Sequence, residues 1–82
     1  MIDPNRRQMF TDLYRMAEFY EQPPFQPGDI EGNANWFAKA NEDWLVPFVR
    51  KYPEMLAFDL AASIVDDAGR KAKEANNQRP II

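Results

Sequence analysis

The side chains that usually carry enzyme chemistry are scarce in this chain. Its 82 residues include no histidine and no cysteine, so the usual general base, the usual transition-metal ligands and the thiolate nucleophile are all missing. Thr11 is the only threonine and Ser63 the only serine, and neither has the neighbouring base that a nucleophilic hydroxyl needs. We therefore expect a protein that is not an enzyme and has no catalytic residue.

Carboxylates are the remaining chemical option. Asp59, Asp66 and Asp67 are expected on the exposed side of one helix, where two carboxylates could bind a hard cation or share a proton. The spacing favours a simpler role, because Asp66 precedes Arg70 and Asp67 precedes Lys71 by one helical turn, which stabilises a solvated helix. The scattered glycines form no phosphate-binding loop. We expect neither a metal site nor a cofactor.

The charges are unevenly distributed around a net charge of −3. Acidic residues dominate positions 18–67, whereas both ends of the chain are mildly basic. The basic ends could contact DNA, although the acidic centre and the negative net charge argue against nucleic acid as the main partner. The candidate nucleic-acid contacts of this alternative are Arg6, Arg7, Arg70, Lys71 and Lys73.

The sequence has no feature of a membrane or exported protein. The first residues lack the apolar core of a signal peptide, and no run of about 18 apolar residues could cross a bilayer. Without cysteine the chain forms no disulfide, which is compatible with a reducing compartment. We expect a cytoplasmic protein with no membrane partner.

Residues 30–52 contain both tryptophans and are expected to organise the core. Their apolar side chains repeat on one half of a helical wheel, with Phe37 and Trp44 at the centre of the core. Pro47 removes one backbone hydrogen bond, but the apolar phase continues beyond it, so we predict one helix kinked near residue 47. Asn41 interrupts the apolar face. It needs a partner for a buried amide, or it caps a separate second helix.

Two further amphipathic helices flank this one. Asp3 and Pro4 make a good helix start, and Pro53 is expected at the first position of the last helix. The last helix has an apolar face with many small side chains, made of Ala57, Phe58, Leu60, Ala61, Ile64, Val65, Ala68 and Ala72. The predicted segments are a helix over 4–21, a connector over 22–29, a helix over 30–52, a helix over 53–76 and a tail over 77–82.

These patterns predict an all-α fold in a single domain over residues 1–82. The fold is a small three-helix bundle, with a proline-rich connector between helices 1 and 2 and a proline kink in helix 2. Prolines and a glycine in the connector cannot continue a helix. No alternating pattern typical of a strand is present.

Two runs of the sequence carry a resemblance to a known group of proteins. The run AEFYEQPPFQPGD (residues 17–29) and the later run LAASIVDDAGRKAKEAN (residues 60–76) are similar to those of short helical proteins encoded on bacterial mobile genetic elements. The resemblance implies no activity and no catalytic residue. It implies an accessory protein that acts by binding another protein.

Several large apolar side chains fall outside the predicted core faces. Phe19 points away from the apolar face of its helix, Phe25 lies in the connector, and Trp36 lies at the edge of the central helix. The connector could fold back so that these three rings close one end of the core. Alternatively, the side chains form an exposed apolar patch with an acidic rim, as at a protein interface. The candidate interaction residues are Phe19, Phe25, Trp36, Met55 and Leu56.

We therefore expect a small acidic helical interaction protein, an accessory or regulatory factor. It binds an unknown protein partner or forms a homo-oligomer. The alternative is a DNA-binding accessory factor that uses the basic residues near the two ends of the chain.

Overall fold

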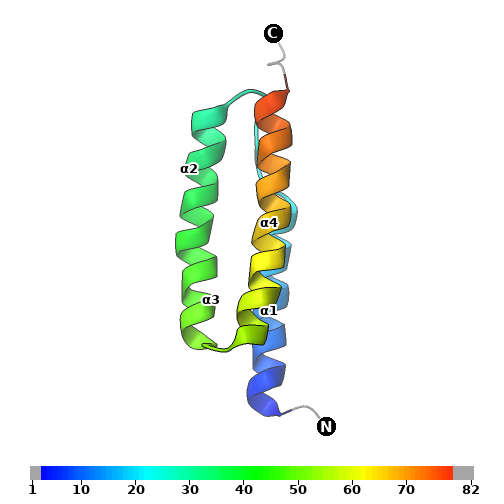
Figure 1. The fold of residues 1–82 in the computed structure, drawn as a ribbon, viewed down its shortest axis with the longest axis vertical. Helices are drawn as coiled ribbons and strands as arrows, with labels where there is room; N and C mark the ends of the chain where they lie inside the picture. Colours follow the sequence, from blue (N-terminus) through cyan, green and yellow to red (C-terminus); the bar gives the residue numbers. More distant parts are fainter. Residues whose placement is uncertain (1–2, 79–82) are drawn as a thin grey trace.

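The computed structural model describes residues 3–78, and all regular structure in this range is helical. Three long helical segments pack side by side (Figure 1), which confirms the predicted three-helix bundle. Their elements are α1 (Pro4–Glu21), α2 (Ile30–Ala40), the π-helix η1 (Asn41–Leu45), α3 (Val46–Lys51) and α4 (Met55–Asn77).

The three segments run up, down and up. α1 and α4 point in the same direction, and the segment of α2, η1 and α3 runs antiparallel to both (Figure 1). Residues 22–29 carry the chain to the far end of the bundle, which we call the connector end. Residues 52–54 join α3 to α4 at the opposite end, which we call the turn end.

α4 turns a face of small side chains toward the other helices. Ala57, Ala61 and Ala68 are completely buried, and their small size lets the neighbouring helices approach closely. The larger side chains of the core come from α1 and α3. The other buried apolar residues are Met9, Met16, Tyr20, Ala40, Phe48 and Ala75.

Phe37 and Trp44 are not at the centre of the core, as we expected from the helical wheel. Both are only partly buried and pack against the core from its edge. The centre is occupied instead by Met9, Met16 and Tyr20, which are almost fully buried. These long side chains of α1 fill the space between the other two helical segments.

The helical conformation continues through Pro47, and a π-helical turn precedes the proline. Backbone angles remain helical at Asn41, Leu45 and Val46. The N–H of Val46 donates to the carbonyl of Asn41, five residues back, instead of four. This wider turn lies where the proline would otherwise disturb the α-helical hydrogen bonds. The chain is therefore helical without a break from Ile30 to Lys51, one residue short of the predicted helix, and its irregularity lies at 41–45 and not at the predicted position near 47.

Asn41 finds its partner across the bundle. The Tyr20 hydroxyl donates a 2.8 Å hydrogen bond to the side-chain oxygen of Asn41, and Tyr20 is only 2% exposed. Burial raises the pKa of Tyr20 to about 12, because a tyrosinate here would lose its solvation. Of the two alternatives for Asn41, the partnered amide is correct and the helix cap is wrong.

We expect Tyr20 to make the fold sensitive to alkaline pH. Its folded-state pKa is raised from 10.0, so its contribution to stability is complete below pH 10 and is lost as the pH rises toward 12. The loss should be about 2–3 kcal/mol in the free energy of unfolding. Urea unfolding at several pH values between about 8 and about 12 measures it.

Two phenylalanine variants provide the comparison. Tyr14 is 68% exposed, so Tyr14→Phe should keep the alkaline loss of stability, whereas Tyr20→Phe should lack the part due to Tyr20. If Tyr20→Phe and the parent lost stability equally between these pH values, the buried phenol would not be its source.

Asn33 holds the connector against two helices. It is 2% exposed, accepts a hydrogen bond from the N–H of Gln26 and donates one to the carbonyl of the same residue, both at 2.9 Å. It also donates to the side-chain oxygen of Asn76 at 2.9 Å. Gly28 adds a bond from its N–H to the carbonyl of Ala75 at 2.7 Å. Its φ of 75° is a left-handed conformation that favours glycine.

Asn33→Ala should therefore destabilise the protein strongly. The substitution leaves both backbone groups of Gln26 without their partners, and we expect a cost of about 2–4 kcal/mol. Chemical denaturation of the variant measures this cost. Asn35→Ala is the matched control, because Asn35 is exposed on the same helix. Equal midpoints for the two variants would contradict this role of Asn33.

The last helix begins two residues later than we predicted. Pro53 is not its first residue, because α4 starts at Met55 and Glu54 is extended, with φ −137° and ψ 155°. In this conformation the Glu54 carboxylate lies 2.9 Å from the guanidinium of Arg6, and its N–H donates to the carbonyl of Tyr52 at 2.8 Å. The proline therefore belongs to the turn. Of the predicted tail, residue 77 is the last of α4 and residues 79–82 lie outside the described range.

Candidate protein-interaction site

Three of the five candidate interaction residues pack together toward the connector end. The ring of Phe19 stacks on Trp36, with centroids 5.4 Å apart, and on Trp44 at 4.9 Å. Phe25 meets Trp36 edge-on at 5.1 Å. The connector thus folds back so that Phe25 contacts Trp36, as in the first of our two alternatives, while Phe19 stays 37% exposed.

The other two candidates lie elsewhere, so the five residues do not form one surface. Met55 and Leu56 occupy the first turn of α4 at the turn end, whereas Phe25 lies in the connector (Figure 1). The separation follows from the topology. α4 starts beside the end of α3, and the connector spans the opposite end of the bundle. The helical phase of each residue does not show which helix ends are neighbours, so the sequence could not predict this separation.

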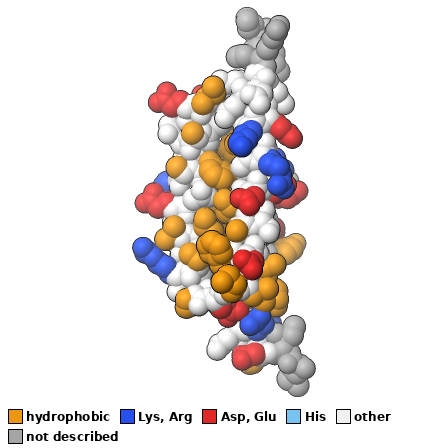
Figure 2. All heavy atoms as spheres, viewed as in Figure 1, with side chains coloured by type: hydrophobic (Ala, Val, Ile, Leu, Met, Phe, Trp, Pro, Cys, Tyr) orange, Lys and Arg blue, Asp and Glu red, His pale blue; other side chains and the backbone are white. Residues whose placement is uncertain are grey.

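A different apolar surface lies between α3 and α4. Met55 is 74% exposed and Phe58 57% exposed, and together with Val49 they line a shallow groove of about 370 Å³. Figure 2 shows hydrophobic side chains gathered along the junction of these helices, most densely toward the turn end. We call the surface formed by Val49, Met55 and Phe58 the α3–α4 face.

Phe58 is the residue of this surface that the sequence analysis missed. We predicted it on the buried face of its helix, next to Ala57, but it is more than half exposed. The buried stripe of α4 is narrow because it consists of alanines packed closely against the other helices, so a neighbour one step around the helix lies outside it. In the sequence, the regular spacing of buried-type alanines with one large apolar residue next to them could have indicated that Phe58 is exposed.

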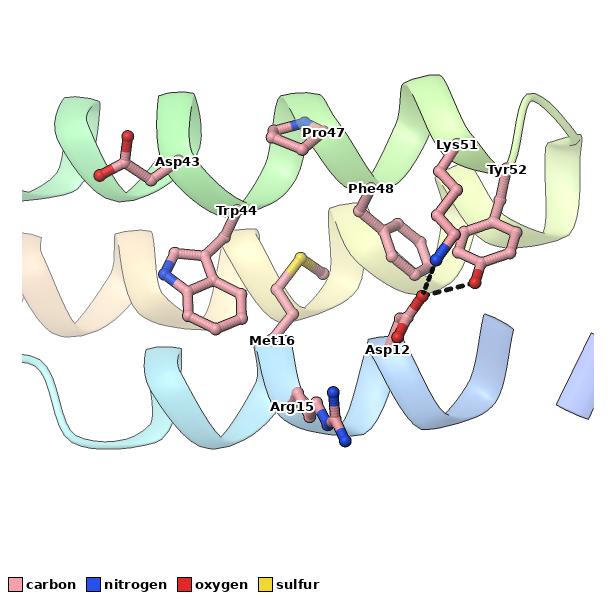
Figure 3. Close-up of a pocket in the computed structure, with 9 residues that line it drawn as sticks. All are labelled: Asp12, Arg15, Met16, Asp43, Trp44, Pro47, Phe48, Lys51 and Tyr52. Carbon is pink, nitrogen blue, oxygen red and sulfur yellow. Dashed lines mark hydrogen bonds and ion pairs between the residues drawn. The ribbon is translucent and has the colours of Figure 1, made fainter. Parts of the chain in front are cut away.

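A second groove, of about 270 Å³, lies between α1 and α3 and contains a cluster of polar groups (Figure 3). The ammonium of Lys51 lies 3.0 Å from one carboxylate oxygen of Asp12, and the Tyr52 hydroxyl donates to the same oxygen. Gln8 donates to the other oxygen at 3.0 Å. Both oxygens of Asp12 are therefore occupied by hydrogen bonds within the monomer.

The pKa values in this cluster favour the ordinary charge states. The hydrogen bond from Tyr52 lowers the pKa of Asp12, and the bond to Asp12 raises the pKa of Lys51. Desolvation, followed by the bond to Asp12, raises the pKa of Tyr52. Each shift keeps the groups as carboxylate, ammonium and neutral phenol at neutral pH. The cluster therefore links α1 to α3 through hydrogen bonds between charged and polar groups.

Asp12 should contribute to stability at neutral pH and lose this contribution in acid. Its folded-state pKa lies below the ordinary value of 3.8, so the contribution is complete above that value and is lost as the pH falls through the lower, folded-state pKa. Thermal melts from about pH 7 to about pH 2 should show a smaller acid-induced decrease for Asp12→Asn than for the parent.

The exposed Glu42 supplies the control for this prediction. Glu42→Gln should leave the acid-induced decrease in melting temperature close to that of the parent, because no ion pair involves Glu42 in the described part of the chain. An equal decrease for Asp12→Asn and Glu42→Gln would mean that Asp12 gains nothing from its three partners.

The basic residues of the DNA-binding alternative are divided between two places. Arg6 and Arg7 lie near the start of α1, whereas the other three lie in the second half of α4, toward the connector end (Figure 1). Several are paired with acids within the monomer. Arg6 pairs with Glu54 at 2.9 Å, and Arg70 pairs with Asp67 at 3.5 Å. The structure does not bring the five residues into one basic surface.

Two other kinds of site are absent from residues 3–78. No group of three or more acidic side chains in this range is arranged to hold a metal ion. None of the helices described here is both long enough and apolar enough to cross a membrane. Met55 and Phe58 of the α3–α4 face are among the most exposed large apolar side chains of residues 3–78.

No protein-family model, curated protein or solved structure matches this chain. The similarity to proteins of bacterial mobile elements therefore stays a prediction, and the assignment of function depends on the chain's own geometry.

Proposed function

We propose that this protein acts by binding a protein partner through its α3–α4 face, as an accessory or regulatory factor without catalytic activity. The exposure of Met55 and Phe58, 74% and 57%, is the observation that carries the proposal. Full burial of one such side chain is worth about 1.5–3 kcal/mol. In the isolated monomer these side chains remain exposed, so much of this burial free energy is not gained on folding.

The shape and surroundings of the face also support binding. Its residues come from two helices and line one groove, so they form a contiguous surface and not scattered apolar positions. An aromatic ring at the centre of such a surface is a typical hot spot. The exposed Glu54 also lines the groove and adds a charged group to the apolar surface.

The DNA-binding alternative has weaker support. Its basic residues lie in two separate places, and two of the three on α4, Arg70 and Lys71, pair with Asp67. A net charge of −3 also opposes binding that depends on the release of counterions. We therefore place the protein-binding function first.

A photoreactive benzophenone amino acid at position 58 tests the function in the cell of origin. Irradiation should link position 58 to a protein, because this side chain would lie inside the interface. The matched control carries the same group at position 14, where Tyr14 is also strongly exposed but on α1. Protein adducts at position 58 and none at position 14 are expected. Absence of adducts at position 58, or equal adducts at both, would contradict the proposal.

Substitution of the same residue separates binding from folding. Phe58→Ser should change the melting temperature by only a few degrees, because the side chain is mostly exposed. It should abolish the adduct formed by a benzophenone placed at the neighbouring position 55. If instead Phe58→Ser unfolded the protein, Phe58 would belong to the core and the face would not be a binding surface.

A further inference from the structure

We propose that the partner on the α3–α4 face is a second copy of this chain, with the two α4 helices packed antiparallel about a two-fold axis. The inference depends on the proposed function and names its partner. In this dimer Phe58 of each copy inserts beside Gly69 of the other, and Met55 lies over Ala72. Ala62 and Val65 meet near the axis.

Gly69 is the first observation behind this inference. A glycine inside a helix costs about 1 kcal/mol relative to alanine, a cost that a packing reason can offset. The monomer provides none, because a Cβ at Gly69 would meet only the ring of Phe37, at an ordinary contact distance of 3.7 Å. The space at this position is therefore open to a side chain from outside the monomer.

The groove at Gly69 is complementary to the exposed side chain of Phe58. A groove of about 410 Å³ surrounds the glycine and is lined by Phe37, Val65 and Lys73, among others. Phe58 and Gly69 lie three helical turns apart on the same side of α4. A two-fold axis between them places each ring of Phe58 in the other copy's groove. Such a surface is complementary to itself, as a symmetric dimer requires.

The charges of α4 favour the antiparallel direction. Residues 54–67 contain four acids and no base, whereas residues 70–74 contain three bases and one acid. Figure 2 shows basic side chains over the upper part of α4 and acidic ones below them. An antiparallel pair brings each acidic half onto a basic half, with Asp59 close to Arg70 of the other copy. A parallel pair would face acid with acid.

One contact opposes the dimer. Asp66 of the two copies would lie near the axis on the same flank of the helix pair, where like charges repel.

The area available for the dimer interface is also modest. The surface of the monomer is 6080 Å², and an interface of about one tenth of it per copy falls at the low end of specific complexes. We therefore expect a reversible dimer with micromolar affinity.

Sedimentation of the purified protein over a wide concentration range tests the dimer. The parent should change from monomer to dimer as the concentration rises. Gly69→Gln should weaken the dimer at least about tenfold, because the new side chain fills the groove that would accept Phe58.

Two other variants separate dimerisation from folding and from charge. Gly69→Ala should melt at the same temperature as the parent or higher, since the monomer has room for the methyl group. Asp66→Asn should strengthen the dimer about twofold to fivefold, because it removes the repulsion.

Single cysteines test the direction of the two helices, since the chain has no cysteine of its own. Ala62→Cys lies near the axis and should form a disulfide-linked dimer under mild oxidation. Asn77→Cys lies at the end of α4. In an antiparallel pair it is far from residue 77 of the other copy, so it should form no disulfide-linked dimer. Linking of both variants would indicate a parallel pair and overturn the proposal.

The outcomes separate the dimer from the function on which it depends. A parent that stays monomeric at all concentrations, or affinity unchanged in Gly69→Gln, overturns the dimer. Adducts of position 58 with a different protein would then keep the proposed function and replace only its partner. An adduct of twice the monomer mass, lost in Gly69→Gln, supports both.

Discussion

The close approach of α4 to the rest of the bundle is the constraint on which the other features depend. It requires small side chains, and Ala57, Ala61 and Ala68 are completely buried along one narrow stripe. Alanine buries little apolar area, so most of the hydrophobic contribution comes from the long side chains of α1, from Phe48 and from the partly buried side chains packed against the core. The same narrow stripe leaves Met55 and Phe58 mostly exposed, whereas Leu60, Ile64 and Val65 pack against the core.

Polar contacts position the segments that packing alone would leave free. Asn33 fixes the connector through three hydrogen bonds, and Tyr20 reaches across to Asn41 at the π-helical turn. Each buried polar group is costly unless it is partnered, so each contact selects one arrangement of its segments. Among the described residues, no buried side-chain nitrogen or oxygen lacks a hydrogen-bond partner, which agrees with a fold specified in this way.

The sequence predicted the helices well and their mutual packing less well. Apolar periodicity, the cap at Asp3 and the prolines of the connector are local signals, and they identified α1 and the long helix of residues 30–51. The exposure of Phe58 and the separation of Met55 from Phe25 depend on which helices are neighbours at each end. That order is a long-range property, so helical phase could suggest candidate residues but could not group them into a site.

The monomer therefore contains two features that its own stability does not explain. Phe58 exposes an aromatic ring, and Gly69 gives up helix stability although a methyl group would fit beside Phe37. Each feature alone is compatible with a protein that binds nothing, because natural sequences are seldom at their stability optimum. Their positions on the same side of α4, on either side of a change in charge from acidic to basic, make each one the complement of the other in a second copy. The proposed two-fold contact would account for the ring, the glycine and the order of charges together.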